Sequence, residues 1–150
     1  TPTASNPGAD ECPGTNDQAR TTSNHPPTLA DTLVIFGCRY QAKDCLYGAE
    51  WKQWATTSHA NLTYVVAASR DQPEKVYVQH RIRENGARIW DILGPRRGIA
   101  YLCGTSGKMP EQVKQSIVDV FVEHGHMNVD QAVRYLSTLE TERRWQEECW

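Results

Sequence analysis

The fold is decided by a short and almost uninterrupted apolar run, TLVIFGC (residues 32–38), which ends in glycine and cysteine. Two further runs have the same character, LTYVVAAS (62–69) and GIAYLCG (98–104). Runs of this length, without a regular alternation of polar positions, are typical of strands that are buried on both faces. The sequence therefore predicts three strands of a parallel sheet.

Segments with a helical spacing of apolar residues separate and follow these strands. They are residues 42–55, 75–93 with a break or bend around Asn85-Gly86, 110–125 and 128–139. This alternation predicts a doubly wound α/β fold, in which helices cover both faces of a parallel sheet. In such a sheet, ligands bind at the carboxyl ends of the strands, beside the N-termini of the helices that follow.

Two helix starts can be placed from their first residues. Pro110 suits the first position of a helix, because the N–H group that it lacks has no partner there. Asn128 suits an N-cap position, with Gln131 placed to complete a capping box. We expect each helix to bury one apolar face, which is Val113, Ile117, Val120 and Phe121 in the first and Val129, Ala132, Val133, Leu136 and Leu139 in the second.

The first 30 residues differ in composition from the rest of the chain. They are rich in Thr, Ser, Asn, Pro and Gly and hold almost no large apolar side chain. Such a segment cannot bury enough surface to offset the entropy that ordering costs. We expect residues 1–30 to be a flexible linker or an insertion, and residues 31–150 to form one domain.

Composition and charge exclude several classes of protein. The net charge of −2 at pH 7 gives no reason to expect a nucleic-acid partner, and no apolar run approaches the roughly 20 residues that span a bilayer. The five cysteines are odd in number and form no CxxC pair, and the five histidines lack metal-ligand spacing. We therefore expect a cytoplasmic protein without a membrane segment, a disulfide framework or a metal site.

The residues that follow the predicted strands favour a phosphorylated ligand. Arg39 follows the first strand, Ser69 and Arg70 follow the second, and Cys103 and Gly104 begin a Gly-rich loop after the third. Cations, hydroxyl groups and free backbone N–H groups at one sheet edge suit a phosphate group. Each of these residues also has a simpler explanation. A loop arginine is often only solvated, and a cysteine at a strand end often packs into the core. The loop lacks the GxxxxGK[ST] spacing, and no feature places a histidine beside Cys103 for a cysteine hydrolase.

Four motifs taken together resemble one family. They are FGCR after the first strand, SR followed by KVYVQH after the second, YLCG at the third, and an aromatic residue at the end. In this order, from about Leu33 to Trp150, they resemble the C-terminal NADP(H)-binding domain of the diflavin reductases, which have the ferredoxin–NADP+ reductase fold. KMPEQV, RYL and RRWQEECW are most similar to the cytosolic NADPH-dependent branch that serves iron–sulfur cluster assembly. The resemblance implies an oxidoreductase that transfers hydride from NADPH to FAD, and then electrons through FMN to an iron–sulfur protein of the anamorsin type.

The resemblance also implies roles for the cofactor-binding residues. Ser69 and Arg70 match the pair that binds the 2′-phosphate of NADPH, for which a hydroxyl and a guanidinium group are suitable donors. The other contacts to this phosphate and to the adenosine fall within KVYVQ, which is Lys75, Val76, Tyr77, Val78 and Gln79. Residues 75, 77 and 79 do not share a helical face, so we expect an extended or irregular backbone there. Arg39 matches a contact nearer to the pyrophosphate, and Gln112 stands where relatives often carry Asp for a ribose contact.

A second set of residues is implied at the reacting end of the cofactor. Cys103 matches the cysteine beside the nicotinamide C4, and Gly104 begins the loop that follows it. Glu148 takes the place of an acidic residue, usually Asp, which positions that cysteine and carries charge. Trp150 matches the aromatic residue that covers the flavin ring and swings aside for the nicotinamide, which suits a chain end that can move.

Part of the family pattern is missing from this sequence. The first strand of the domain and its Gly-rich pyrophosphate loop should precede Leu33, but residues 1–30 contain neither, and no FAD-binding or FMN-binding motif is present. We therefore expect a C-terminal fragment that lacks the first strand and does not turn over without its flavin domains. The alternatives are a P450-type or sulfite-type diflavin reductase, or a truncated nucleotide-binding module without catalysis.

Overall fold

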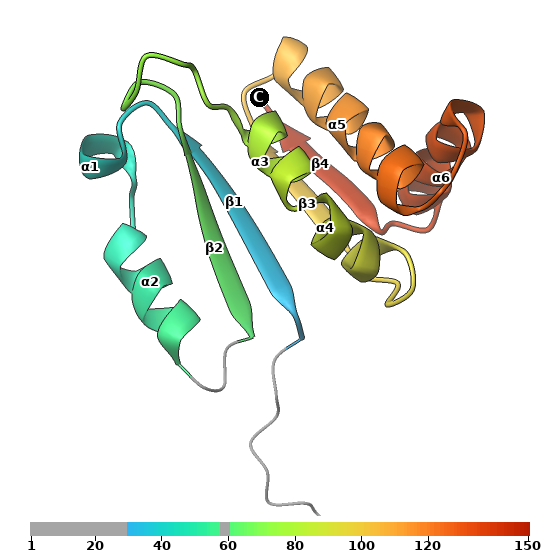
Figure 1. Ribbon diagram of the computed structural model, residues 1–150, viewed down its shortest axis with the longest axis horizontal. Coiled ribbons are helices and arrows are strands. Elements are labelled where there is room, and N and C mark those ends of the chain that lie inside the picture. Colours follow the sequence, from blue (N-terminus) through green and yellow to red (C-terminus); the bar gives the residue numbers. More distant parts are fainter. Residues whose placement is uncertain (1–29, 58–60) are drawn as a thin grey trace, which may run out of the picture.

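A computed structural model describes residues 30–57 and 61–150 of the chain (Figure 1). The predicted linker, residues 1–30, therefore lies outside the described residues except for its last position. The elements in chain order are β1 (Thr32–Cys38), α1 (Gln41–Asp44), α2 (Gly48–Thr56), β2 (Leu62–Ala68), α3 (Val78–Glu84), α4 (Gly86–Leu93), β3 (Ala100–Gly104), α5 (Lys108–His124), α6 (Val129–Thr141) and β4 (Trp145–Cys149). None of these helices is long and apolar enough to cross a lipid bilayer.

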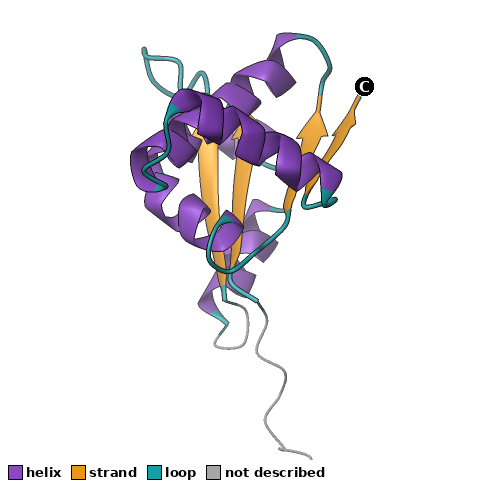
Figure 2. Ribbon diagram, turned by 90° about the vertical axis from the view of Figure 1, so that its right-hand side faces the viewer, coloured by secondary structure: helices purple, strands orange, loops and turns teal. Residues whose placement is uncertain are grey.

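The four described strands form two parallel pairs instead of one sheet. β1 pairs with β2 over its whole length, from Thr32 opposite Leu62 to Cys38 opposite Ala68. β3 pairs with β4 from Ala100 opposite Trp145 to Gly104 opposite Cys149. No ladder joins β1 to β3 among the described residues, so the prediction of one continuous doubly wound sheet is not confirmed. All four strands nevertheless run in the same direction, and their carboxyl ends lie at the same end of the molecule (Figures 1 and 2).

Helices cover both faces of the β1–β2 pair. On one face, Trp51 of α2 stacks on Tyr64 of β2, with ring centroids 5.6 Å apart. On the other face, α3 comes so close to β1 that a Cβ atom on Gly37 would meet Val78 Cγ1 at 2.9 Å. Glycine at position 37 is therefore what allows the start of α3 to lie against this strand.

The apolar core lies between β3–β4 and helices α3 to α6. Phe121 is completely buried in α5, and its ring meets Trp90 of α4 and Tyr135 of α6 edge-on, at centroid distances of 5.8 and 5.1 Å. The predicted α5 face is confirmed, because all four of its residues are buried. In α6 only Ala132, Leu136 and Leu139 are buried, while Val129 and Val133 are exposed because the buried stripe of this helix is narrower than predicted.

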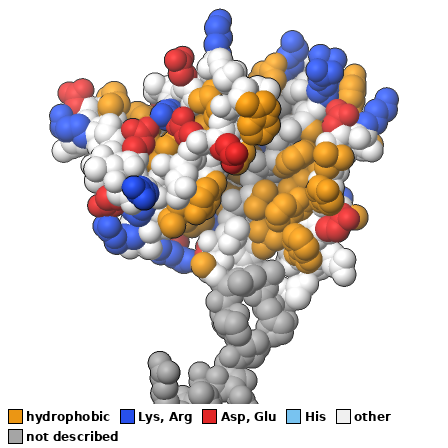
Figure 3. Space-filling model, turned by 180° about the vertical axis from the view of Figure 1, so that it is seen from behind, with side chains coloured by type: hydrophobic (Ala, Val, Ile, Leu, Met, Phe, Trp, Pro, Cys, Tyr) orange, Lys and Arg blue, Asp and Glu red, His pale blue; other side chains and the backbone are white. Residues whose placement is uncertain are grey.

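The other face of β3 is open to solvent. Side chains alternate along this strand, so that Ala100 and Leu102 pack toward the helices while Tyr101 and Cys103 are exposed. Figure 2 shows β3 and β4 at the margin of the molecule. Figure 3, the view from behind, shows that hydrophobic side chains reach the surface on the back of the molecule, most of them toward the β1–β2 side. The β3–β4 pair is therefore covered by helices on one face only.

The helix boundaries agree with the sequence signals at two of three places. α3 and α4 meet at Asn85, where the predicted break lies, and Asn128 and Gln131 form the predicted capping box, with N···O distances of 2.9 Å in both directions. Pro110 is the exception, because α5 begins at Lys108 and Pro110 is its third residue. A proline is tolerated there, since N–H groups of the first turn have no partner within the helix.

The last strand, β4, was not predicted from the sequence. It is held by the residues at its start. Trp145 is buried, and the Arg144 side chain, 7% exposed, donates to the carbonyls of Leu93 at 2.9 Å and Gly98 at 3.3 Å and to the Tyr135 hydroxyl at 3.2 Å. A buried arginine that is satisfied by hydrogen bonds thus fixes the chain as it enters β4.

Candidate functional site

The predicted site residues gather at the carboxyl end of the strands, in two groups. One group follows β1 and β2 and extends into α3, and the other lies at the ends of β3 and β4 (Figure 1). The first contains the residues expected at the phosphate and adenosine end of the cofactor, and the second those expected at its reacting end.

Backbone hydrogen bonds join the loops that follow β1 and β2. The N–H of Ser69 donates to the carbonyl of Cys38 at 2.9 Å, and the N–H of Arg70 donates to the carbonyl of Arg39 at 2.8 Å. The parallel ladder is thereby continued beyond the strands, and it carries Arg39, Ser69 and Arg70 side by side. The carboxylate of Asp71 accepts from the N–H of Gln41 at 3.0 Å and ties the second loop to the start of α1.

The cations of this group are free to meet an anion. Arg39, Arg70 and Lys75 are all exposed, and none of them forms an ion pair with another residue of the described ranges. Arginines elsewhere on the surface are paired, such as Arg83 with Asp119 at 2.8 Å. Guanidinium and ammonium groups form a donor set that fits a phosphate group. The Ser69 hydroxyl lies beside this set and donates to the carbonyl of Cys38 at 3.2 Å.

The loop between β2 and α3 is folded back by one glutamine side chain. The amide of Gln72 donates to the carbonyl of Ala68 at 2.7 Å and to that of Glu74 at 2.9 Å. The following residues are irregular and extended, as predicted, and the helix begins at Val78. Lys75 and Tyr77 are exposed, while Val76 and Val78 are half-buried on the other side of the segment. The two valine side chains are therefore less exposed than those of Lys75 and Tyr77.

Two predicted site residues from separate helices are in contact. The side-chain amide of Gln79, in the first turn of α3, donates to the side-chain carbonyl of Gln112, in the first turns of α5, at 3.2 Å. This hydrogen bond connects the loop after β2 with the helix that follows β3. It places Gln112 within the first group. From the sequence, Gln112 could be assigned only by its place in the family motif.

At the other end of the site, Cys103 and Glu148 lie opposite each other on β3 and β4. Partners in a parallel ladder point to the same face of the sheet, and neighbouring strands are about 4.8 Å apart. Both residues are exposed, on the face that the helices leave open. The pair that the resemblance implied is therefore brought together by the strand that the sequence did not predict.

The neighbouring carboxylate, Glu147, points to the opposite face, where contacts with other side chains of the protein hold it. Its carboxylate lies 2.7 Å from the ammonium group of Lys114, which also contacts Glu140 at 2.7 Å. Burial acts to raise the pKa of Glu147, but hydrogen bonds from Lys114 and Trp145 outweigh burial and lower it. For Lys114, burial acts to lower the pKa, and the hydrogen bonds to Glu140 and Glu147 outweigh it and raise the pKa.

The backbone of Trp150 is fixed, in contrast to the expected mobile chain end. Its N–H donates to the carbonyl of Gly104 at 3.1 Å, and its carbonyl accepts from the N–H of Ser106 at 2.7 Å. The indole side chain is 73% exposed. Gly104 and Gly107 take φ values of +156° and +97°, which favour glycine, so that the loop can turn around this contact. The two hydrogen bonds tie the backbone of Trp150 to the loop after β3, while its side chain is exposed.

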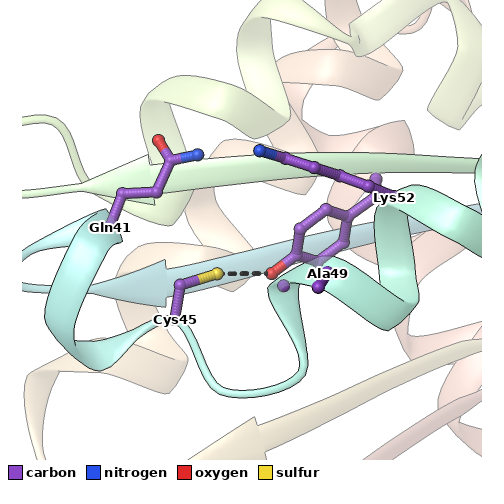
Figure 4. Close-up of a pocket in the computed structure, with 6 residues that line it drawn as sticks. Gln41, Cys45, Ala49 and Lys52 are labelled. Atoms are coloured by element: carbon purple, nitrogen blue, oxygen red, sulfur yellow. Dashed lines mark hydrogen bonds between the residues drawn. The ribbon is translucent and has the colours of Figure 1, made fainter.

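A separate small pocket lies beneath α1 and α2, outside both groups. It has a volume of about 180 Å³ and is lined by Gln41, Cys45, Gly48, Ala49, Lys52 and Tyr64 (Figure 4). The Cys45 sulfur and the Tyr64 hydroxyl form a hydrogen bond of 2.9 Å. Burial and then this hydrogen bond raise the pKa of Tyr64, and burial together with the nearby Cys45 thiol raises the pKa of Cys38. The sequence did not single out this pocket.

Three residues that hold the site were assigned no role in it from the sequence. Gln72 and Asp71 fix the loop after β2, and His80 accepts a hydrogen bond from the backbone of Tyr77. Only His80 had a detectable signal, its place three residues after a helix N-cap, where capping-box acceptors occur.

Within residues 30–57 and 61–150, no three or more His, Cys, Asp or Glu side chains are grouped so that they could hold a metal ion.

Comparison with known proteins agrees with this geometry. A model of the oxidoreductase NAD-binding domain family matches residues 18–115. The chain is 38% identical over 117 residues to NADPH-dependent diflavin oxidoreductase 1 of Xenopus laevis, an alignment that covers 78% of this chain and 19% of the relative. It is 34% identical over 122 residues to NADPH–cytochrome P450 reductase of Musca domestica, covering 81% of this chain and 18% of the relative.

These relatives are oxidoreductases, and the chain spans only about a fifth of their length. The match confirms the predicted resemblance to the NADP-binding domain of the diflavin reductases. The chain belongs to the oxidoreductase NAD-binding domain family.

Proposed function

We propose that this chain is the NADP(H)-binding part of a cytosolic diflavin oxidoreductase. The observation that carries the proposal is the group of free cations Arg39, Arg70 and Lys75 at the ends of β1 and β2 and in the loop that leads to α3. Three cations that form no ion pair within the described residues suit a ligand with more than one phosphate group. The names of the two relatives, both of which contain NADPH, support the same conclusion.

In this proposal the first group selects the phosphorylated cofactor. Ser69, Arg70 and Lys75 bind the 2′-phosphate, and Arg39 binds nearer to the pyrophosphate. Tyr77 offers its ring to the adenosine, and Gln79 with Gln112 borders the ribose. Because NADH lacks the 2′-phosphate, Arg70 is the residue that distinguishes NADPH from NADH.

The second group serves the reacting end. When it is bound, the nicotinamide supplies a hydride for the FAD of the parent protein. The Cys103 thiol borders the nicotinamide C4, and the Glu148 carboxylate opposite it on β4 orients the thiol and carries charge. The indole of Trp150 covers the flavin ring and turns aside about its own side-chain bonds, since hydrogen bonds to Gly104 and Ser106 hold its backbone.

Each of the two strand pairs has an edge without a partner strand among the described residues, and this supports a proposal for the fold of the parent domain. We propose that residues 31–150 form most of one NADP(H)-binding domain and that residues 1–30 are a linker or an insertion. β1 and β3 each have a partner on one side only within the described chain. One further parallel strand between them would join the pairs into a single doubly wound sheet, and its following loop would add backbone N–H groups for the pyrophosphate. The same parent supplies FAD and FMN.

The electron acceptor is the least constrained part of the proposal. We propose an iron–sulfur protein of the anamorsin type in the cytoplasm, as the similarity to diflavin oxidoreductase 1 suggests. A P450-type reductase is the second candidate, because the relative from Musca domestica is almost as similar. Electron transfer from the parent protein to each purified acceptor separates the two candidates.

Calorimetric titration of this chain tests the binding function. The two ligands are 2′,5′-ADP and 5′-AMP, which differ by the 2′-phosphate alone. The proposal predicts clear binding of 2′,5′-ADP and a much weaker response to 5′-AMP. Equal affinity for both would contradict the role of Arg70 and Ser69, and binding of neither would overturn the binding function proposed for this chain.

A further inference from the structure

His80, in the first turn of α3, contacts the adenosine-binding residue proposed above in two ways. Its Nδ1 atom accepts a hydrogen bond of 2.9 Å from the backbone N–H of Tyr77. The imidazole ring also lies nearly parallel to the Tyr77 ring, with centroids 6.0 Å apart and an interplanar angle of 21°. One side chain thus contacts both the backbone and the ring of a proposed adenosine-binding residue.

Tyr77 needs such support because of where it lies. It is the last residue before α3, with an extended backbone (φ −111°, ψ 168°), and its side chain is 42% exposed. Among the described residues His80 is the only aromatic ring stacked on it. An exposed ring at the end of an irregular loop has many rotamers and backbone positions, and ordering it on binding reduces affinity.

We infer that His80 is a positioning residue that holds Tyr77 ready to stack on a purine. The hydrogen bond from the Tyr77 N–H fixes the backbone from which the ring projects, and the imidazole lies alongside one side of the ring. A purine on the other side would extend a stack that already contains two rings. Because the Nδ1 atom is the acceptor, the acting form of His80 is neutral, with its proton on Nε2.

This inference rests on the proposed function, since it gives Tyr77 a purine to bind. Its ordinary alternative is that His80 caps α3 and has no effect on the ligand. Side chains at the third helical position often accept the N–H of the N-cap residue. The two explanations differ in one respect, because only a residue that acts through Tyr77 loses its effect on binding when Tyr77 is removed.

A double-mutant cycle on this chain measures that difference. Affinity for 2′,5′-ADP is determined by calorimetry for the wild type, His80→Ala, Tyr77→Ala and the double variant. We expect His80→Ala to bind about five- to tenfold more weakly, the scale of one hydrogen bond. In the Tyr77→Ala background the same change should have less than about a twofold effect, whereas a full additional loss would overturn the inference.

Two more variants separate the hydrogen bond from the ring contact. His80→Asn keeps an acceptor oxygen at the position of Nδ1 without the ring, and His80→Phe keeps a ring without the acceptor. The inference expects His80→Asn to stay within about twofold of the wild type and His80→Phe to resemble His80→Ala. The reverse order would contradict it. His126→Ala, an exposed histidine beyond the far end of α5, is the control and should bind as the wild type does.

The cycle also distinguishes failure of the inference from failure of the function. If the wild type prefers 2′,5′-ADP but the His80 and Tyr77 effects are additive, the site exists and His80 is only a cap. If the wild type binds neither 2′,5′-ADP nor 5′-AMP, the proposed function of this chain and the inference are both overturned. Faster hydrogen exchange at the Tyr77 amide in His80→Ala, restored in His80→Asn, checks the hydrogen bond itself without any ligand.

Discussion

The two strand pairs of this molecule differ in how many buried side chains surround them. The half around β3 and β4 contains almost all of the buried side chains, including the ring cluster of Phe121, Trp90 and Tyr135. In the β1–β2 pair only Ala67 and Ala68 are buried, and α2 has no buried residue. The proposed phosphate and adenosine contacts lie mostly on the lightly packed half, and Cys103 and Glu148 lie on the heavily packed half. The residues proposed to recognise the cofactor therefore lie in the part of the molecule with few buried side chains. The residues proposed at its reacting end lie beside the apolar core.

The largest expected difference between the halves is in the cost of removing an aromatic ring. Phe121→Ala should lower the free energy of unfolding by about 3–5 kcal/mol, because the ring is fully buried. The matched change on the other half, Trp54→Ala, removes a larger side chain that is 51% exposed and should cost less than about 1 kcal/mol. Urea unfolding of both variants measures the contrast, and similar losses would remove it.

The next effect concerns two arginines that contact the same carboxylate. Arg144 is buried and Arg97 is exposed, and both reach Glu142, at 3.0 and 3.1 Å. Arg144→Lys loses the forked hydrogen bonds to the carbonyls of Leu93 and Gly98 and should cost about 2–3 kcal/mol of stability. Arg97→Lys should change stability by less than about 0.5 kcal/mol. If thermal unfolding gives equal shifts, Arg144 is not the anchor of β4.

The third effect concerns Arg70, which lies on the lightly packed half. Arg70→Ala should weaken binding of 2′,5′-ADP by about 2 kcal/mol, about 30-fold, because a charge-assisted contact to the 2′-phosphate is lost. Binding of 5′-AMP and the unfolding free energy should stay nearly constant, since Arg70 is exposed and forms no ion pair within the described chain. Calorimetry with both ligands checks the result. Equal losses for the two ligands would refute the assignment of the 2′-phosphate to Arg70.

The smallest effect separates two adjacent carboxylates. Because the pKa of Glu147 is lowered by folding, its contribution to stability is full above the ordinary glutamate pKa of about 4.3 and is lost as the pH falls through the lowered value. Glu147→Gln should cost about 1 kcal/mol at pH 7 and remove part of the acid sensitivity. Glu148→Gln, on the open face of β4, should leave the stability at pH 7 unchanged. Urea unfolding between pH 7 and pH 3 tests this, and an identical pH profile for wild type and Glu147→Gln would contradict it.

Local signals in the sequence predicted the packed half well, but not its last strand. The buried face of α5, the break at Asn85 and the cap at Asn128 depend on spacings of a few residues, which the sequence displays directly. RRWQEEC has no apolar alternation, and β4 forms because Arg144 reaches carbonyls about 50 residues away in the chain. Such contacts have no local pattern from which they could be predicted.

The candidate site was predicted in part, for the same reason. The order of motifs gave the candidate residues, and parallel strands explain why Arg39 lies beside Arg70 and Cys103 opposite Glu148. The side chains that hold the loop, such as Gln72, bond to backbone carbonyls and leave no distinctive pattern in the sequence.

The measurement that tests the division between the halves most directly is hydrogen exchange of this chain with and without saturating 2′,5′-ADP. We expect added protection in residues 39–41 and 69–79 and around Gln112, with little change in residues 100–106 and 145–150. Protection concentrated in β3 and β4, or spread evenly over both halves, would contradict this expectation.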